Sequence, residues 1–433
     1  MASAVRPAQP AASPETGRPE LGRPDLGRVW WVRSGLEILG GRLAIAGQDA
    51  EALAREHGTP LFVYDRRRLA ENAERLIAAL DRAGLHHRVR FALKANPDPA
   101  ALAALRDLVG IDACSPGEVL RALKCGWPAE DISYTGTNVS ERDLDVLLAY
   151  PIHLNLDAIS QIERVGRRLA TAGGRRRPPI GLRINPGAGA GYNEKLAYSG
   201  ARPTKFGIYE DRLDEALEAA ARFGLPVDTI HVHVGSGWLG DGLEAFEAAI
   251  GRVAGIARRL RADGHPIREL NVGGGLGVPA RAGERPVDPD AYAAALRRAL
   301  GDLVEAGVVV GSEPGDYLAK DSAILLGEVV TVEERGGTTF VGLDIGWNVN
   351  CSYFIYRYAQ EFVPCRAPDA ERTQTVTVAG HINEAGDVFA EDYPLPPVAE
   401  GDILALLNAG GYHQAMSSTH CLRPHAPAIF LDR

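Results

Sequence analysis

Lysine is scarce in this sequence, so a reaction that needs an amine nucleophile has few places to occur. Lys94 directly follows the apolar run Phe91-Ala92-Leu93, and we expect it to end a buried strand. Burial there lowers the pKa of an amine and favours the neutral form that attacks carbonyl groups. A lysine whose stem lies along apolar surface while its head reaches water would give the same pattern. The five lysines are Lys94, Lys124, Lys195, Lys205 and Lys320.

Two glycine-rich segments follow later apolar runs. They read HVHVGSG at 231–237 and NVGGGLG at 271–277. Glycine lets backbone N–H groups approach an anion closely, and loops after the late strands of a barrel commonly hold phosphate. Ser236 adds a hydroxyl donor. One such loop is more often a turn without a ligand, but two in succession favour a phosphate site.

A carboxylate closes another apolar run, in Ser312-Glu313-Pro314-Gly315. Paired with a protonated ring nitrogen, Glu313 would stabilise the carbanion that an electron-accepting cofactor must carry. On its own, a glutamate before Pro-Gly is more often a turn residue.

These side chains can meet only if the apolar runs form one sheet. Eight runs, separated by helical Ala-, Leu- and Arg-rich stretches, predict parallel strands buried on both faces and therefore a closed (β/α)8 barrel. A doubly wound open sheet is the alternative. The predicted strands are 90–94, 110–115, 132–136, 153–157, 180–186, 230–236, 270–275 and 308–314.

The helical pattern stops after Glu313, and strand-like segments separated by Gly, Pro and Asp follow. They predict a second, mostly antiparallel β-domain, which an early hairpin around Gly40-Gly41 joins. We therefore expect a disordered lead-in (1–28), an N-terminal hairpin that joins the β-domain (29–54), a barrel (55–311) and a C-terminal β-domain (312–433).

Composition narrows the class of protein. The 433 residues carry a formal charge of −9, which argues against nucleic acid or anionic lipid as the main partner. We find neither a signal peptide nor an apolar stretch near the ~20 residues that cross a bilayer, and expect a cytoplasmic protein. Five widely spaced cysteines without a C-x-x-C pair predict neither a disulfide framework nor a metal site. They are Cys114, Cys125, Cys351, Cys365 and Cys421.

Seven segments occur in an order that resembles the alanine-racemase-fold decarboxylases dependent on pyridoxal 5′-phosphate (PLP). That family includes the diaminopimelate, ornithine and arginine decarboxylases, and the likeness is greatest to the diaminopimelate branch. It implies removal of the α-carboxylate of an amino acid by a homodimer whose active sites are shared between subunits. The segments are FALKANPDP, DACSPGEVLRAL, HVHVGSGW, NVGGGLGVP, SEPG, AGHINEAGDVFAEDYPLP and NAGGYHQAMSS.

The resemblance assigns roles at matching positions. Lys94 would hold the cofactor covalently, His233 would stack on its ring, and Glu313 would bind its nitrogen. The other residues around the cofactor would be Asp112, Glu118, Arg183, Ser236, Gly273, Gly274, Gly275 and Tyr412.

Departures from the family pattern bear on the substrate. Asp316 stands where arginine usually follows Glu-Pro-Gly, and Asn383 stands where the family has a cysteine associated with proton return to Cα. His420 and Cys421 are candidate replacements for that cysteine, although ordinary packing explains them equally well. The stretch after Asp344, with Trp347 and Tyr353, replaces an arginine-containing one. The expected substrate-binding residues are Asp316, Asp344, Trp347, Glu384 and Asp387.

Asp316 and Asn383 together lead us to expect a modified or conjugated amino acid, in a secondary pathway such as siderophore or antibiotic assembly. Diaminopimelate or another basic amino acid is the alternative. An amino-acid racemase of the same fold, a non-catalytic PLP-binding relative and a barrel enzyme for phosphorylated sugars also remain open. Release of CO2 separates the decarboxylase from the racemase, and absorbance of bound PLP excludes the sugar enzyme.

Overall fold

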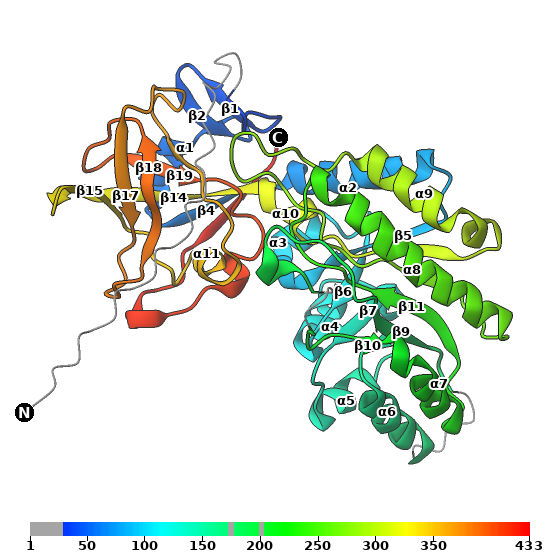
Figure 1. The fold of residues 1–433 in the computed structure, drawn as a ribbon. Coiled ribbons are helices and arrows are strands. Elements are labelled where there is room, and N and C mark those ends of the chain that lie inside the picture. The colour runs from blue at the N-terminus through cyan, green and yellow to red at the C-terminus, as the bar shows by residue number, and fades with distance from the viewer. Residues whose placement is uncertain (1–28, 172–176, 199–202) are drawn as a thin grey trace, which may run out of the picture.

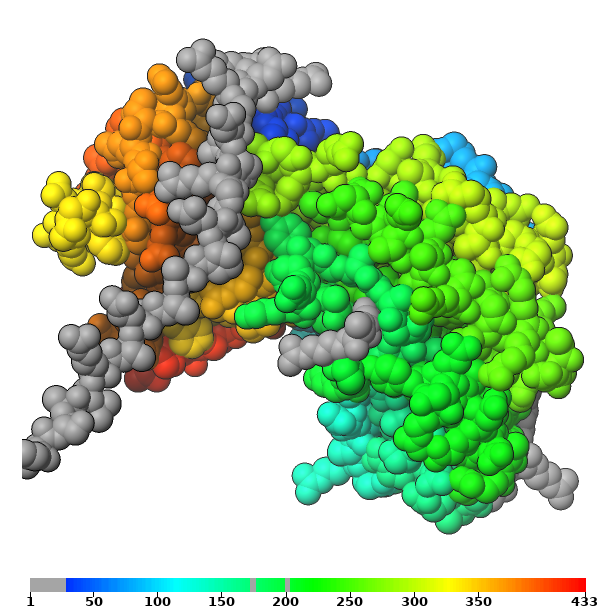
Figure 2. Space-filling view, viewed as in Figure 1, coloured from blue at the N-terminus to red at the C-terminus, as the bar shows by residue number. Residues whose placement is uncertain are grey.

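The computed structural model describes residues 29–171, 177–198 and 203–433. These residues form a barrel and a β-domain that lie side by side (Figure 1). The same two lobes are visible in the space-filling view (Figure 2). The lead-in expected at 1–28 falls outside the described residues. Within the described residues, no helix is both long and apolar enough to cross a membrane.

Eight parallel strands close into a ring. β8 pairs with β9 as well as with β7, and this pairing joins the two ends of the sheet. Each strand overlaps one of the eight predicted runs, so the (β/α)8 prediction is confirmed and the open sheet is excluded. The strands are β5 (His87–Ala92), β6 (Gly110–Ala113), β7 (Ile132–Gly136), β8 (His153–Leu156), β9 (Ile180–Asn185), β11 (Val227–Val232), β12 (Glu269–Asn271) and β13 (Val309–Ser312).

Helices cover the outside of the ring, and local capping residues fix where several of them begin after a strand. After β6, for example, Ser115 accepts a hydrogen bond from the Glu118 N–H and Pro116 occupies the first helical position, so α4 begins there. The covering helices are α2 (Arg66–Arg82), α3 (Pro99–Ala103), α4 (Pro116–Lys124), α5 (Glu141–Leu147), α6 (Ile159–Thr171), α7 (Leu213–Arg222), α8 (Leu243–Ala262) and α9 (Pro289–Glu305).

The β-domain is a mostly antiparallel sheet in which β14 is the longest strand. β14 pairs with β15 and β19, while β17 joins β15 in parallel. The strands are β14 (Ala323–Arg335), β15 (Thr338–Leu343), β16 (Phe362–Pro364), β17 (Gln374–Ala379), β18 (Val388–Leu395), β19 (Ile403–Leu406) and β20 (Ala428–Leu431).

The early hairpin joins this domain as expected. β1 (Leu36–Leu39) and β2 (Arg42–Ile45) turn at Gly40-Gly41, where both φ angles are positive (58° and 75°), and β3 (Gln48–Asp49) pairs with β2. The Leu43 N–H donates to the Cys365 carbonyl at 2.9 Å. Hairpin side chains share an apolar core with β16 and β19.

The expected domain boundaries are wrong at both ends of the barrel. β4 (Leu61–Asp65) pairs with β14 and β20, so it belongs to the β-domain and not to a barrel that starts at residue 55. Its alternate side chains enter two different apolar cores of the β-domain. No strand was predicted here, and only the boundary at residue 55 placed this segment in the barrel. At the other end, α10 (Asp316–Ala319) still packs into the barrel core, because Tyr317–Ala319 are part of that cluster.

Candidate active site

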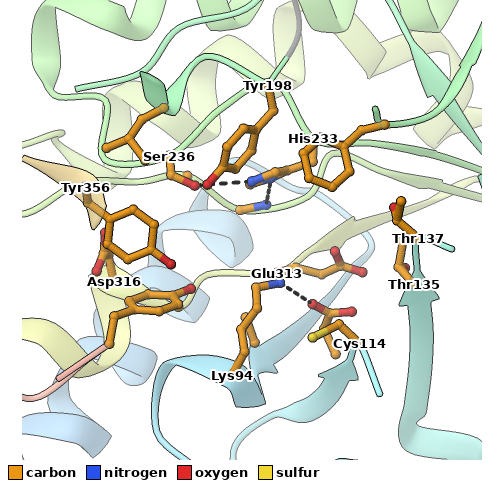
Figure 3. A pocket seen from close by; sticks show the side chains of 18 of the residues that line it. Lys94, Cys114, Thr135, Thr137, Tyr198, His233, Ser236, Glu313, Asp316 and Tyr356 are labelled. Atoms are coloured by element: carbon orange, nitrogen blue, oxygen red, sulfur yellow. Dashed lines mark hydrogen bonds and ion pairs between the residues drawn. The ribbon is translucent and has the colours of Figure 1, made fainter. Parts of the chain in front are cut away.

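A cavity of about 310 Å³ opens at the carboxyl ends of the barrel strands. The loop after β9, the helix α11 (Cys351–Tyr356) and the C-terminal segment around Tyr412 complete its wall, so both domains line it (Figure 3). Predicted site residues that line the cavity are Lys94, Asp112, Arg183, His233, Ser236, Gly274, Gly275, Glu313, Asp316 and Tyr412.

Lys94 lies in a short 3-10 turn, Leu93–Ala95, just beyond the end of β5. The Lys94 side chain is 44% exposed, and its Nζ lies 3.4 Å from Asp112 Oδ2. Burial of the site disfavours the ammonium form, but the Asp112 carboxylate outweighs this and raises the pKa of Lys94 well above its ordinary value. The expected lowering of the Lys94 pKa is therefore wrong, because the sequence did not reveal the carboxylate of the next strand.

Asp112 is a buried carboxylate at the end of β6. Burial and the nearby Glu313 raise the pKa of Asp112, and Lys94 partly offsets this effect. Lys94 and Asp112 thus form an ion pair in the cavity lining, and the Asp112 carboxylate is close enough to accept a proton from Lys94.

Glu313, one residue beyond the end of β13, is held by two neighbouring strands. One carboxylate oxygen accepts from Asn271 Nδ2 at 2.6 Å, and the other lies 2.9 Å from His231 Nε2. Burial opposes ionisation of Glu313, but its interaction with His231 lowers the pKa to about 2. Glu313 is therefore an anion fixed in position, which suits a partner for a protonated ring nitrogen.

His233 is a neutral imidazole facing the cavity. Burial and the positive charge of Arg183 lower its pKa well below the ordinary value. The Gly274 N–H donates to Nδ1 at 3.2 Å, which places the ring proton on Nε2, 3.4 Å from the Ser236 hydroxyl. The ring is thus fixed beside the cavity, where it can pack against a flat ligand.

The second glycine loop packs so tightly that side chains are excluded. A Cβ on Gly274 would lie 2.1 Å from the Glu313 carbonyl oxygen, and one on Gly275 would lie 2.0 Å from the Gly235 carbonyl oxygen. Gly273 has φ 69° and does not line the cavity; its N–H donates to Asn271 Oδ1 at 2.9 Å. Gly274, Gly275 and Ser236 therefore form a close-walled recess suited to a phosphate.

The remaining predicted cofactor residues support this arrangement. The Arg183 guanidinium lies 4.6 Å from the centre of the Phe206 ring and lines the cavity. Glu118 stays behind the cavity wall, where its carboxylate accepts from the Cys114 N–H at 2.7 Å. Tyr412 adopts φ 59°, and its N–H donates to the Ala95 carbonyl at 2.8 Å, which ties the C-terminal segment to the turn carrying Lys94.

The other predicted substrate and proton-transfer residues do not line the cavity of their own chain. Asp344 accepts from Thr59 Oγ1 at 2.6 Å and from the Glu328 N–H at 2.8 Å. Asp387 is buried and accepts from the Trp347 and Ile382 N–H groups at 2.8 and 2.7 Å. Both aspartates hold β-domain loops in place.

A second group lies on the surface of the β-domain. The Trp347 ring lies 4.7 Å from the His420 ring, and His420 is 3.7 Å from Glu384. Asn383 and Cys421 are exposed nearby in sequence. Tyr353 packs against Phe354 and Phe389 and not in the cavity.

Several residues that line the cavity were not predicted from the sequence. His231 lies two residues before His233 in the same run, and Tyr356 and Tyr358 lie close in sequence to Tyr353, the tyrosine that was predicted. Signals for the strand residues were available, because alternate positions share a face. The residues that were not predicted are Ala92, Cys114, Thr135, Thr137, Leu196, Tyr198, Phe206, His231, Gly315, Tyr356 and Tyr358.

Together, the lysine, the anionic glutamate, the neutral histidine and the glycine recess define a site that fits PLP. Bound there, PLP supplies an electron-accepting ring that stabilises negative charge at the substrate Cα. Lys94 would hold it, Glu313 would face its ring nitrogen, and Ser236 with the glycine recess would hold its phosphate. The fold and site are thus those of a PLP-dependent barrel enzyme.

Comparison with known proteins identifies the family. Residues 67–320 match the family model described as "Pyridoxal-dependent decarboxylase, pyridoxal binding domain". The chain is 37% identical over 399 residues to diaminopimelate decarboxylase of Methanothermobacter thermautotrophicus, covering 91% of each protein. It is 31% identical over 407 residues to the Streptomyces coelicolor enzyme, covering 90% of this chain and 88% of that one. The chain belongs to the pyridoxal-dependent decarboxylases.

Solved structures agree. Diaminopimelate decarboxylase of M. jannaschii in complex with L-lysine superposes with a TM-score of 0.83 at 26% identity, covering 92% of this chain and 93% of that one. The Helicobacter pylori enzyme with L-lysine gives 0.81 at 28% identity, covering 88% and 93%. The protein is a PLP-dependent carboxy-lyase of the diaminopimelate decarboxylase type.

Proposed function

We propose that this enzyme removes the α-carboxylate of diaminopimelate, the substrate for which its relatives are named. The observation that carries the proposal is the convergence of Lys94, Glu313, His233 and the glycine recess on one cavity. Similarity along nine-tenths of the chain to several diaminopimelate decarboxylases supports the choice of substrate.

The chain's own groups account for the steps around the reacting carbon. Lys94 would hold PLP until a substrate amine takes its place, and Asp112, 3.4 Å from Nζ, orients Lys94 and can exchange a proton with it. Glu313, whose pKa is lowered to about 2, would face the ring nitrogen of PLP as an anion. Tyr356, Tyr358 and Tyr412 narrow the cavity between the two domains, which limits the access of water.

A modified or conjugated amino acid is the second candidate. The relatives reported above lend it no support, since they are diaminopimelate decarboxylases. The observation that favours it is Asp316, a buried carboxylate on the cavity wall at the position where the sequence departs from the family pattern.

Release of CO2 from four amino acids tests both candidates. The PLP-loaded enzyme is assayed with meso-diaminopimelate, ornithine, lysine and arginine at equal concentration. Fastest turnover of meso-diaminopimelate supports the first candidate, and efficient turnover of any of the four excludes the second. Failure of all four contradicts the first candidate and directs the search to conjugated substrates.

We also propose that the enzyme is a cytoplasmic homodimer with shared active sites. All five cysteines are free, as expected in a reducing compartment. The apolar side chains of Ile355 and Leu422 are 51% and 94% exposed, which favours a covering surface near the Asn383–Asp387 loop.

Subunit mixing tests the shared site. Lys94→Ala and Glu384→Ala homodimers should each be inactive, while a mixed dimer should regain one intact site. Activity of the mixture above the sum of its parents supports the proposal. A monomer in sedimentation, or no gain on mixing, contradicts it.

A further inference from the structure

Asp316 and Lys320 form a buried ion pair beside the cavity. They lie one turn apart at the two ends of α10, and only 6% and 3% of their surfaces are exposed. The Lys320 Nζ lies 3.7 Å from Asp316 Oδ2. Because both side chains are shielded from bulk water, the neighbouring residues determine which of the two charged groups a ligand in the cavity can contact.

Tyr358 contacts both charged groups. Its hydroxyl donates to Asp316 Oδ2 at 2.9 Å, and the Lys320 Nζ lies 3.0 Å from the centre of its ring. The aromatic face thus covers the ammonium. Asp316 and Tyr358 line the cavity and Lys320 does not, so a ligand meets the carboxylate and not the lysine.

Asp316 retains an unused acceptor. Its Oδ1 is buried and has no hydrogen-bond partner among the described residues, and the same holds for Lys320 Nζ. A buried carboxylate oxygen without a donor is costly, and a ligand that brings an N–H group would relieve this cost. Figure 3 places Asp316 near Tyr356, at the end of the cavity away from Thr135 and Thr137.

We infer that Asp316 determines specificity by accepting a hydrogen bond from an ammonium group at the distal end of the substrate. Lys320 and Tyr358 are positioning residues: they fix the Asp316 side chain and occupy Oδ2, which leaves Oδ1 for the ligand. A distal carboxylate at this position would meet another carboxylate at close range and be repelled. The inference rests on the proposed decarboxylation. Diaminopimelate carries an ammonium and a carboxylate on its distal carbon, so its ammonium should face Asp316 and its distal carboxylate should point away from it.

Three amino acids of matched length test this inference. Lysine has a distal ammonium, 2-aminoadipate a distal carboxylate and norleucine a distal methyl group. The PLP-loaded wild type, Asp316→Asn and the exposed-site control Asp369→Asn are titrated with each while visible absorbance reports binding, and CO2 release gives kcat and KM. Wild type and control should favour lysine over 2-aminoadipate. Asp316→Asn should lower that preference by about tenfold or more, mainly through KM for lysine, and leave norleucine nearly unchanged.

Lys320 is tested in the same titrations. Lys320→Met leaves Asp316 without a counter-charge and should weaken lysine binding by disordering the acceptor, while the pair Asp316→Asn with Lys320→Met should resemble Asp316→Asn alone. If Lys320→Met does not fold, the paired variant, which buries no lone charge, still reports on Asp316.

The outcomes separate the two proposals. CO2 release with a preference that is the same in wild type and Asp316→Asn overturns the inference alone, as does tighter binding of 2-aminoadipate by wild type. A change in PLP affinity without a change in preference also overturns it, because Asp316 would then act on the phosphate. Absence of CO2 release from meso-diaminopimelate contradicts the proposed function, while the absorbance titrations with the three matched amino acids still measure the preference.

Discussion

The Glu313 and Asp316 regions of the cavity hold their carboxylates in different ways. Both oxygens of Glu313 have protein partners, Asn271 and His231. Asp316 has partners at Oδ2 only, and its Oδ1 and the nearby Lys320 Nζ lack hydrogen bonds within the described residues. The two carboxylates are separated by only Pro314 and Gly315 in sequence.

This difference separates two tasks. A carboxylate with both oxygens satisfied by its own protein is locked in one orientation and one charge state, as a permanent partner for a cofactor requires. A carboxylate with one free oxygen remains ready for a group that arrives and leaves. The Glu313 region, in which both carboxylate oxygens are bonded, serves chemistry common to every substrate. The Asp316 region, in which one oxygen is free among the described residues, serves the selection of the substrate.

Replacing Lys94, which both the cofactor chemistry and the substrate selection require, should have the largest effect on activity. Lys94→Ala should lower decarboxylation by about 10³-fold or more, because no other amine can take its place at the reacting carbon. Borohydride reduction followed by mass measurement should find a covalent PLP adduct in wild type and none in the variant. Lys205→Ala, at a lysine outside the cavity lining, is the matched control and should keep both adduct and activity.

Replacing the fully bonded carboxylate should have the next largest effect. Glu313→Gln removes the anion that keeps the ring nitrogen protonated and should lower kcat by about 10²-fold for every substrate alike. Uniform loss across lysine, norleucine and 2-aminoadipate, beside the selective loss expected of Asp316→Asn, would sharpen the comparison. A loss from Glu313→Gln that depends on the distal group would break it.

Narrowing the glycine recess should have a moderate effect. In Gly274→Ala the new methyl would lie 2.1 Å from the Glu313 carbonyl oxygen, so the loop must move away from its place beside the phosphate. PLP affinity should fall by about tenfold, measured by equilibrium dialysis. Gly255→Ala, in α8 with nothing within 4 Å of the added methyl, is the control and should not change PLP affinity.

The fold was largely predictable because its signals are local and repeated. Eight apolar runs with helices between them required a sheet covered on both faces, and the strands lie where the runs are. β4 was not predicted as a strand, and the barrel was expected to begin before it. Its pairing partners β14 and β20 lie far later in the sequence, so no local pattern shows that it belongs to the β-domain.

Within the site, only the side chains that directly follow the end of a strand were predictable from the sequence. Lys94, His233 and Glu313 follow directly from strand ends and from the family pattern. Tyr358, in the segment after α11, donates to Asp316 from 42 residues away in sequence, and this approach leaves no mark in the local sequence. Lys320 lies one turn after Asp316, but the sequence alone does not show that the two side chains are buried together. The Lys94 pKa was predicted in the wrong direction for the same reason, since its partner Asp112 lies on the next strand.

The smallest expected effect is on the pH dependence of the free energy of unfolding, and it concerns His413, which lies near Lys320 in the Asp316 region. His413 is 3% exposed; its Nδ1–H donates to the Gly411 carbonyl at 2.9 Å, and its Nε2 has no partner among the described residues. Burial lowers the pKa of His413 from 6.5 to about 4, and the charge of Lys320 adds to this shift. Between these pH values the unfolded chain binds a proton that the folded chain does not, so stability falls as the pH drops from 6.5 to 4 and levels off below.

His413→Gln should remove this dependence. The full shift corresponds to about 3 kcal/mol in the free energy of unfolding between pH 6.5 and pH 4. Urea unfolding of the PLP-loaded enzyme at pH 7, 5.5 and 4 should therefore give a midpoint that falls less steeply in the variant than in wild type. His381, half-buried and also lowered to a pKa of about 4, contributes a similar slope, and His381→Gln measures that share. An unchanged slope in His413→Gln would mean that burial does not hold this side chain neutral in the folded enzyme, and the lowered pKa would be wrong.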